Sequence, residues 1–295
     1  MKRLKNFSYY EPLSVKEAIE TLTEEDGAVP LAGGTDLLVR MKRGEIRPAA
    51  LVNLKHIQNL KKIKSKSGNG TTIGSLASIS DIQGSPVIQA KHALLVQAAG
   101  VLGAPSIRNL ATIGGNIGRA SPASDMSPSL IVLRARIITA GAKGKREVGM
   151  NEFFAGPGKT TLSNAEIITA FYIPEPSPNT GTSYLKLGRR RGGGDCALVG
   201  VAALLTMEND EAQDVGIALS SVGPGPMRAR KAEEVVMSGP LDDERIKEAA
   251  RAAADEVNPI TDLRCSASYR KEMVKVLTYR ALMESLQKAK RGMPE

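Results

Sequence analysis

Hydrophobic and polar positions in the first fifty residues predict a helix, a strand and a second helix in succession. Ser14-Val-Lys-Glu17 has the spacing of a capping box, and apolar residues then recur at helical intervals, which predicts a helix over about 14–24. The apolar run 28–32 reads as a strand that enters Gly33-Gly34-Thr35-Asp36, and residues 37–43 then look helical. The pattern is therefore strand, glycine turn and helix.

The middle of the chain shows the same mixture of short strands and helices. Apolar periodicity predicts one helix over 91–102, stopped by Gly103 and Pro105, and another over 130–133. Strand-like runs occupy 50–54, 71–75, 136–140 and 166–173. A glycine-rich segment at 109–118 lies between these elements and reads as a second turn.

The pattern changes after the Pro-rich and Ser-rich stretch Pro174–Gly181, which predicts a linker. Strand-like runs at 184–187, 197–207 and 215–222 are followed by helical patterns at 228–237, 242–257 and 268–290. Strands followed by helices predict an α+β unit whose antiparallel sheet is covered on one side. We therefore predict a boundary near 177, which divides the chain into domains 1–177 and 178–295.

Composition and charge exclude several classes of protein. The chain has 295 residues and a net charge of +9, which suits an anionic partner. Aromatic residues are only 3% and Trp is absent, which disfavours nucleic acid as that partner. No apolar window is long enough for a membrane span, and the basic N-terminus lacks the apolar middle of a signal peptide, so the sequence predicts a cytoplasmic protein without a membrane span.

Cysteine and histidine are scarce. The thiols of Cys196 and Cys265 cannot supply the ligands of an iron–sulfur cluster, so any such cluster must lie in another chain, and no metal site is expected here. We predict that both thiols are buried and unreactive. His56 and His92 are predicted to be surface or capping residues.

Two glycine turns carry the candidate chemistry. Consecutive glycines in 32–36 and 112–116 let several backbone N–H groups converge on an anion such as a diphosphate, with Thr35, Thr112 and Asn116 as further donors. The alternative is that each glycine pair only permits a tight turn. Neither the Gly-x-Gly-x-x-Gly dinucleotide fingerprint nor a complete P-loop is present.

These motifs also carry a family resemblance. Ala32-Gly-Gly-Thr-Asp36, Ile107-Arg-Asn-Leu-Ala-Thr-Ile-Gly-Gly-Asn116 and Ser121-Pro-Ala-Ser-Asp125 resemble the FAD-binding medium subunit of molybdenum hydroxylases, such as xanthine, carbon monoxide and aldehyde dehydrogenases. The similarity extends over nearly the whole chain. It implies an α+β fold, in which a two-lobed FAD domain of the vanillyl-alcohol-oxidase type, with lobes of about 1–55 and 56–177, precedes a small domain with a three-stranded antiparallel sheet and helices.

The resemblance assigns cofactor-binding residues but no catalytic ones. The first turn would hold the diphosphate and nearby ribityl chain through Leu31, Ala32, Gly33, Gly34, Thr35, Asp36 and Leu37. The second phosphate-side motif corresponds to Ala111, Thr112, Gly114, Gly115 and Asn116, and further polar contacts to Ser121 and Asp125. Leu102 and Ile168 would lie against the flavin ring, and Lys186 near its N1 and O2 edge. A cation there would stabilise charge that develops on reduction.

Each charged assignment has a simpler alternative. Asp36 could cap the following helix, because a carboxylate beside a diphosphate is repelled, and Asp125 could be a turn residue. Lys186 could be an exposed strand residue. Arg189-Arg190-Arg191 could be a solvated charge run, although it precedes Gly192–Gly194, a loop that could cover the flavin.

The resemblance implies an electron-transfer function. FAD in this chain would accept electrons from a [2Fe-2S] small subunit and pass them to NAD or a quinone, while a molybdopterin-binding large subunit oxidises the substrate. The subunits would assemble as a dimer of heterotrimers. The alternatives are a free-standing FAD-dependent oxidase or reductase and a basic polyanion-binding module.

Overall fold

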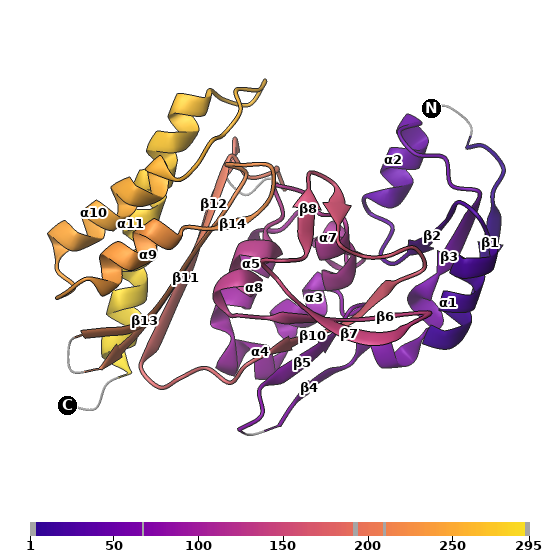
Figure 1. Cartoon of the computed structure of the whole chain (residues 1–295), viewed down its shortest axis with the longest axis horizontal. Helices are drawn as coiled ribbons and strands as arrows, with labels where there is room; N and C mark the ends of the chain where they lie inside the picture. The colour runs from indigo at the N-terminus through magenta and orange to yellow at the C-terminus, as the bar shows by residue number, and fades with distance from the viewer. Residues whose placement is uncertain (1–3, 67, 191–193, 209–210, 293–295) are drawn as a thin grey trace.

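The computed structural model describes residues 4–66, 68–190, 194–208 and 211–292. Figure 1 shows three parts side by side along the long axis: a small sheet near the N-terminus, a central sheet with its helices, and a C-terminal sheet with its own helices. The α+β class predicted from the sequence is confirmed by this mixture of helices and sheets.

The N-terminal sheet is parallel, with β1 (Ser8–Tyr10) and β2 (Ala28–Leu31) pairing on either side of β3 (Ala50–Asn53). Helix α1 (Val15–Glu24) links β1 to β2, and α2 (Leu37–Arg43) links β2 to β3. The predicted Ser14 cap is confirmed, since its hydroxyl accepts from the N–H of Glu17 at 3.1 Å. Gly44 ends α2 in the left-handed conformation.

The central sheet is antiparallel, in the order β4-β5-β10-β6-β7. Its strands are β4 (Ile63–Ser65), β5 (Thr71–Gly74), β6 (Arg136–Gly141), β7 (Gly144–Gly149) and β10 (Ile167–Ile173). Two short 3₁₀ helices, η1 (Leu54–His56) and η2 (Gln58–Lys61), join β3 to β4, and β8 (Phe154–Gly156) pairs with β9 (Lys159–Thr160) in a small hairpin.

Short helices fill the connection from β5 to β6. They are α3 (Ile79–Gly84), α4 (Pro86–Lys91), α5 (Ala93–Val101), α6 (Pro105–Arg108), α7 (Ile113–Gly118) and α8 (Met126–Val132). The predicted helix over 91–102 corresponds to α5, and the one over 130–133 to the second half of α8. No pattern that was used predicted α3, α4, α6, β1, β7 or the β8–β9 hairpin.

The C-terminal sheet has the order β11-β12-β13-β14 among the described residues. Its strands are β11 (Thr180–Leu187), β12 (Val199–Glu208), β13 (Glu211–Ser220) and the short β14 (Met227–Arg228), followed by α9 (Arg230–Met237), α10 (Asp243–Asp255) and α11 (Ala267–Arg291). The expected antiparallel sheet of three strands therefore carries a two-residue fourth strand.

Both faces of this sheet are buried, so the expectation of a sheet covered on one side was wrong. Val199, Val201 and Ala203 lie in a core cluster with residues of α9, α10 and α11. Ala202 and Leu204, which alternate with them along β12, lie in the core of the central part with residues of α5 and α8. The C-terminal sheet is therefore packed between two layers of helices (Figure 1).

None of the described helices is long and apolar enough to cross a membrane.

Candidate functional site

The first glycine turn connects the end of β2 to the start of α2. Gly34 has a φ of 82°, a left-handed conformation that glycine adopts without strain. Within the described chain, the N–H groups of Gly33, Gly34, Thr35 and Asp36 donate no hydrogen bond to a protein acceptor. Several unused amide donors in one half-exposed turn form a site suited to an anion.

Gly33 brings this turn against the second motif. A Cβ atom at Gly33 would lie 2.0 Å from the carbonyl oxygen of Leu110 and 3.0 Å from Cα of Ala111. Real Cβ atoms essentially never lie within 3.0 Å of such an atom. A Cβ atom at Gly115 would likewise lie 3.7 Å from the Cβ of Ala32. The two motifs therefore adjoin in the fold although almost eighty residues separate them, and only a residue without a side chain fits at Gly33.

The second motif is a helix start, and the expectation that its amides are free for an anion was wrong. Thr112 caps α7 by accepting from the N–H of Gly115 at 3.0 Å. The N–H of Gly114 donates to the carbonyl of Ser75 at 2.8 Å. A Cβ atom at Gly114 would lie 2.6 Å from that carbonyl oxygen, so the glycine serves close packing and has no left-handed role.

Side chains still make the second motif polar. Asn116 accepts from the hydroxyl of Ser124 at 2.6 Å, which in turn accepts from the hydroxyl of Ser127 at 2.7 Å. The side-chain nitrogen Nδ2 of Asn116 donates no hydrogen bond within the described residues, whereas its backbone N–H donates to the carbonyl of Thr112 at 2.9 Å. Ser121 lies on the same loop, where its hydroxyl accepts from the N–H of Ala123 at 3.3 Å.

Asp36 is paired with arginine and does not cap α2 through its side chain. Its Oδ2 lies 2.8 Å from Nε of Arg119, at the end of α7, and 3.9 Å from a terminal nitrogen of Arg40. The Nε atoms of both arginines and the hydroxyl of Ser75 are buried without an aligned hydrogen-bond acceptor among the described residues. The site is thus rich in donors and poor in acceptors, which is the donor set that a diphosphate needs.

Lys186 and Asp125 form a buried ion pair. Nζ of Lys186 donates to Asp125 at 2.8 Å and to the carbonyl of Val101 at 3.1 Å, and only 7% and 8% of the two side chains are exposed. Asp125 also accepts from the hydroxyl of Tyr184 at 3.1 Å. The alternatives of an exposed lysine and a simple turn aspartate were wrong. Burial raises the pKa of Asp125, an effect that Lys186 and Tyr184 oppose.

Of the two expected apolar wall residues, Leu102 follows Val101, which accepts from Lys186, and Ile168 lies beside α7. Leu102 ends α5 and Ile168 lies on β10, and both belong to the central core. A Cβ atom at Gly118 would lie 3.6 Å from Cδ1 of Ile168. Gly194 packs against the backbone of 103–104, beside Leu102, whereas the rest of the predicted covering loop, 192–193, and the preceding Arg191 lie outside the described residues.

The cysteine and histidine expectations need correction. Cys196 is exposed and Cys265 is half-buried, so neither is the buried thiol expected. His56 is half-exposed beside Glu11, as expected of a surface residue. His92, however, is buried, with Nε2 lying 2.9 Å from the hydroxyl of Thr71, and burial lowers its pKa to about 4.

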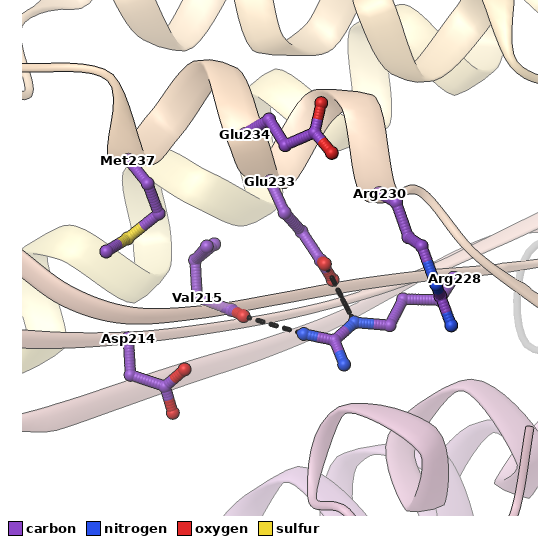
Figure 2. A pocket seen from close by; sticks show the side chains of 7 residues that line it. All are labelled: Asp214, Val215, Arg228, Arg230, Glu233, Glu234 and Met237. Atoms are coloured by element: carbon purple, nitrogen blue, oxygen red, sulfur yellow. Dashed lines mark hydrogen bonds and ion pairs between the residues drawn. The ribbon is translucent and has the colours of Figure 1, made fainter.

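One hollow of the described structure lies away from the glycine motifs. It has a volume of about 510 Å³ and is lined by residues of β13, β14 and α9 (Figure 2). Within it, Glu233 accepts from Nε of Arg228 at 2.6 Å and from the backbone N–H of Ile217 at 2.8 Å. None of the glycine-motif residues lines this hollow, so the glycine motifs remain the candidate site.

Two family models match consecutive parts of the chain. Residues 5–176 match the FAD binding domain in molybdopterin dehydrogenase, and residues 183–285 match the CO dehydrogenase flavoprotein C-terminal domain. The first match spans the glycine motifs and Asp125, and the second spans Lys186.

Relatives and solved structures agree with these matches. The chain is 36% identical to the glyceraldehyde dehydrogenase medium chain of Sulfolobus acidocaldarius, over 94% of this chain and 98% of that protein. It is 32% identical to the carbon monoxide dehydrogenase medium chain of Hydrogenophaga pseudoflava, over 94% and 96%. A solved carbon monoxide dehydrogenase from the same organism superposes with a TM-score of 0.94 at 32% identity, over 97% and 99% of the two chains. This chain belongs to the FAD-binding medium subunits of the molybdenum hydroxylases.

Proposed function

We propose that this chain is the electron-exit subunit of a molybdenum hydroxylase complex. In this role it receives electrons from a [2Fe-2S] small subunit and delivers them, through FAD, to an acceptor such as NAD or a quinone. The observation that carries the proposal is the turn at 33–36, whose amides are unused and which packs through Gly33 on the start of the second motif.

The residues of the site fit FAD. The amides of Gly33–Asp36 would hold the diphosphate, with Leu31, Ala32 and Leu37 forming the ends of the turn. The guanidinium of Arg119, whose Nε is buried without an aligned acceptor among the described residues, is the kind of donor group that a phosphate satisfies. The backbone amides at 114–116 of the second motif are already hydrogen-bonded, so this motif would contribute side chains instead. Asn116 would donate through its side-chain nitrogen and Thr112 through its hydroxyl, while the glycines would let the cofactor approach the backbone closely.

The proposed flavin environment combines apolar walls with one buried cation. Leu102 and Ile168 would exclude water from the ring, and Ser121 and Asp125 would bind the polar side of the cofactor. When bound, FAD supplies the redox chemistry, whereas the protein orients it and limits access to it. Lys186 would favour the negative charge that accompanies reduction, and its bond to Asp125 fixes its head group.

Substrate oxidation belongs, in this proposal, to a molybdopterin-binding large subunit, so no general base is required in this chain. The net charge of +9 would favour docking on acidic faces of the partner subunits. We further propose a dimer of heterotrimers in the cytoplasm, and a division of this chain near 177 into an FAD domain of two lobes, about 1–55 and 56–177, and a C-terminal domain, 178–295.

Absorption spectroscopy and co-purification test the proposal. The chain purified without its partners is expected to show the bands of oxidised flavin at roughly 370 and 450 nm, as isolated or after reconstitution with FAD. A colourless chain that FAD cannot reconstitute would contradict FAD binding. Subunit composition and mass of the complex test the assembly, and reduction of NAD or a quinone by the reduced complex tests the acceptor. Turnover of a substrate by this chain alone would favour a free-standing oxidase instead.

A further inference from the structure

The first glycine turn contains an apparent conflict, because Asp36 places a carboxylate beside the amides that would hold a diphosphate. Two negative groups at contact distance repel each other strongly wherever water is partly excluded. Asp36 is half-exposed, with 50% of its side chain accessible, so solvent removes only part of this repulsion. Some other group must therefore offset its charge.

Arg119 is the nearest such group. It follows the last residue of α7, and its Nε lies 2.8 Å from Oδ2 of Asp36. The bond is an ion pair without hydrogen-bond alignment, since Nε is buried and has no aligned acceptor. The two terminal nitrogens of Arg119 make no hydrogen bond within the described residues. The guanidinium therefore has donors left for a further anion.

The β8–β9 hairpin restricts where this guanidinium can go. A Cβ atom at Gly158, whose φ is 71°, would lie 3.0 Å from a terminal nitrogen of Arg119. The N–H of Gly158 donates to the carbonyl of Ala120 at 2.9 Å, which ties the hairpin to the residue that follows Arg119. Arg119 thus lies between the hairpin and the first glycine turn, and only 33% of its side chain is exposed. A side chain held in this way loses little further freedom on binding.

We propose that Arg119 binds the diphosphate of FAD and that Asp36 is its positioning partner. Asp36 orients the guanidinium through Nε, and the terminal nitrogens of Arg119 donate to phosphate oxygens beside the amides of Gly33 and Gly34. Guanidinium groups suit this task because their donors form a planar fork that matches phosphate. This assignment rests on the proposed FAD function, and it explains why an acidic residue is compatible with the turn.

The alternative is that the two side chains form only a surface ion pair that holds α2 near α7. The two explanations predict different results for the two partners. If the pair is only structural, Asp36→Asn and Arg119→Met weaken FAD binding equally and the double variant resembles either one. If Arg119 binds the diphosphate, Asp36→Asn removes a repulsive charge and leaves the arginine in place, whereas Arg119→Met removes the phosphate contact.

The experiment measures the dissociation constant of FAD in the complex purified with its partner subunits, after removal and titration of the cofactor. Arg119→Met is expected to weaken FAD binding about tenfold or more, the loss of a charge-assisted hydrogen bond. Asp36→Asn is expected to change it by less than about threefold, and the double variant to resemble Arg119→Met. Arg119→Lys, which keeps the charge but loses the fork, is expected to lie in between.

Controls separate this assignment from folding and from the proposed function. Arg43→Met removes an exposed arginine of α2 that pairs with Glu45, so it should leave FAD binding unchanged. Riboflavin, which lacks the diphosphate, should bind the wild type and Arg119→Met equally. Equal riboflavin binding would show that the variant is folded and that its weaker FAD binding comes from the lost phosphate contact. Wild-type binding of FAD with no effect of Arg119→Met, or equal effects of both partners, would overturn the assignment alone. A wild type that does not bind FAD would refute the proposed function as well.

Discussion

Replacing Lys186 by Met tests the buried ion pair at the proposed flavin site. The substitution preserves much of the side-chain volume but leaves Asp125, with 8% of its side chain exposed, without its cation. Removing one partner of a buried ion pair costs about 3–5 kcal/mol in unfolding free energy. That is a large share of the roughly 5–15 kcal/mol that stabilises a typical domain, so the variant should be markedly less stable.

The loss should depend on pH. Burial already raises the pKa of Asp125, and removing Lys186 leaves burial less opposed, so this pKa rises further. A folded-state pKa above the unfolded value means that the group's contribution is fully present below the unfolded pKa and is lost as pH rises through the folded pKa. The variant should therefore differ more from the wild type at about pH 8 than at about pH 5.

Denaturant unfolding at both pH values, followed by circular dichroism, measures the effect. Adding Asp125→Asn to Lys186→Met removes the unpaired carboxylate, so the double variant should recover most of the lost stability and its pH dependence. Equal stability of the single and double variants, or a loss that does not change with pH, would refute the reasoning.

Three further changes test other parts of the fold. Gly33→Ala should release FAD because its Cβ overlaps the start of the second motif, whereas Gly84→Ala, with nothing within 4 Å, should bind FAD normally; equal cofactor content in both would contradict this. The wild type should lose about 3 kcal/mol of stability as pH falls from about 6.5 to about 4, because the pKa of His92 is lowered in the folded state, and His92→Gln should lose less in the same titration. Gly181→Ala should destabilise the protein by about 1–3 kcal/mol, measured by denaturant unfolding, because its Cβ would overlap the backbone of Ser285; wild-type stability would show that α11 can shift.

Local signals account for the elements that the sequence predicted. Ser14 caps α1 and Gly44 ends α2 through interactions within a few residues, so both helix boundaries can be predicted from the local sequence. Similar signals were present but not used for α3, where Ser78 and Asp81 form a complete capping box, and for α4, which begins at Pro86. The second face of the C-terminal sheet was not predictable in this way, because Ala202 contacts helices that are far away in sequence.

The site was predictable as a set of motifs but not as a geometry. Gly-Gly pairs look alike in sequence, yet Gly34 has a positive φ and Gly114 lies inside a helix against Ser75. Only the tertiary fold distinguishes a turn with open amides from a helix start with satisfied ones. Arg119 was missed because its partner, Asp36, is more than eighty residues away, and no periodic pattern connects the two.

The two-sided burial of β11–β13 has a consequence for how the chain can be divided. A fragment beginning in the linker would keep α9–α11 on one face but would present Tyr184, Ala202, Leu204 and Ala218 to water on the other. Such a fragment should self-associate through this exposed apolar face. The N-terminal fragment would in turn expose the apolar faces of α5 and α8 that the C-terminal sheet covers. The segments 5–176 and 183–285 are therefore expected to stabilise each other, so neither should be as stable when it is produced alone.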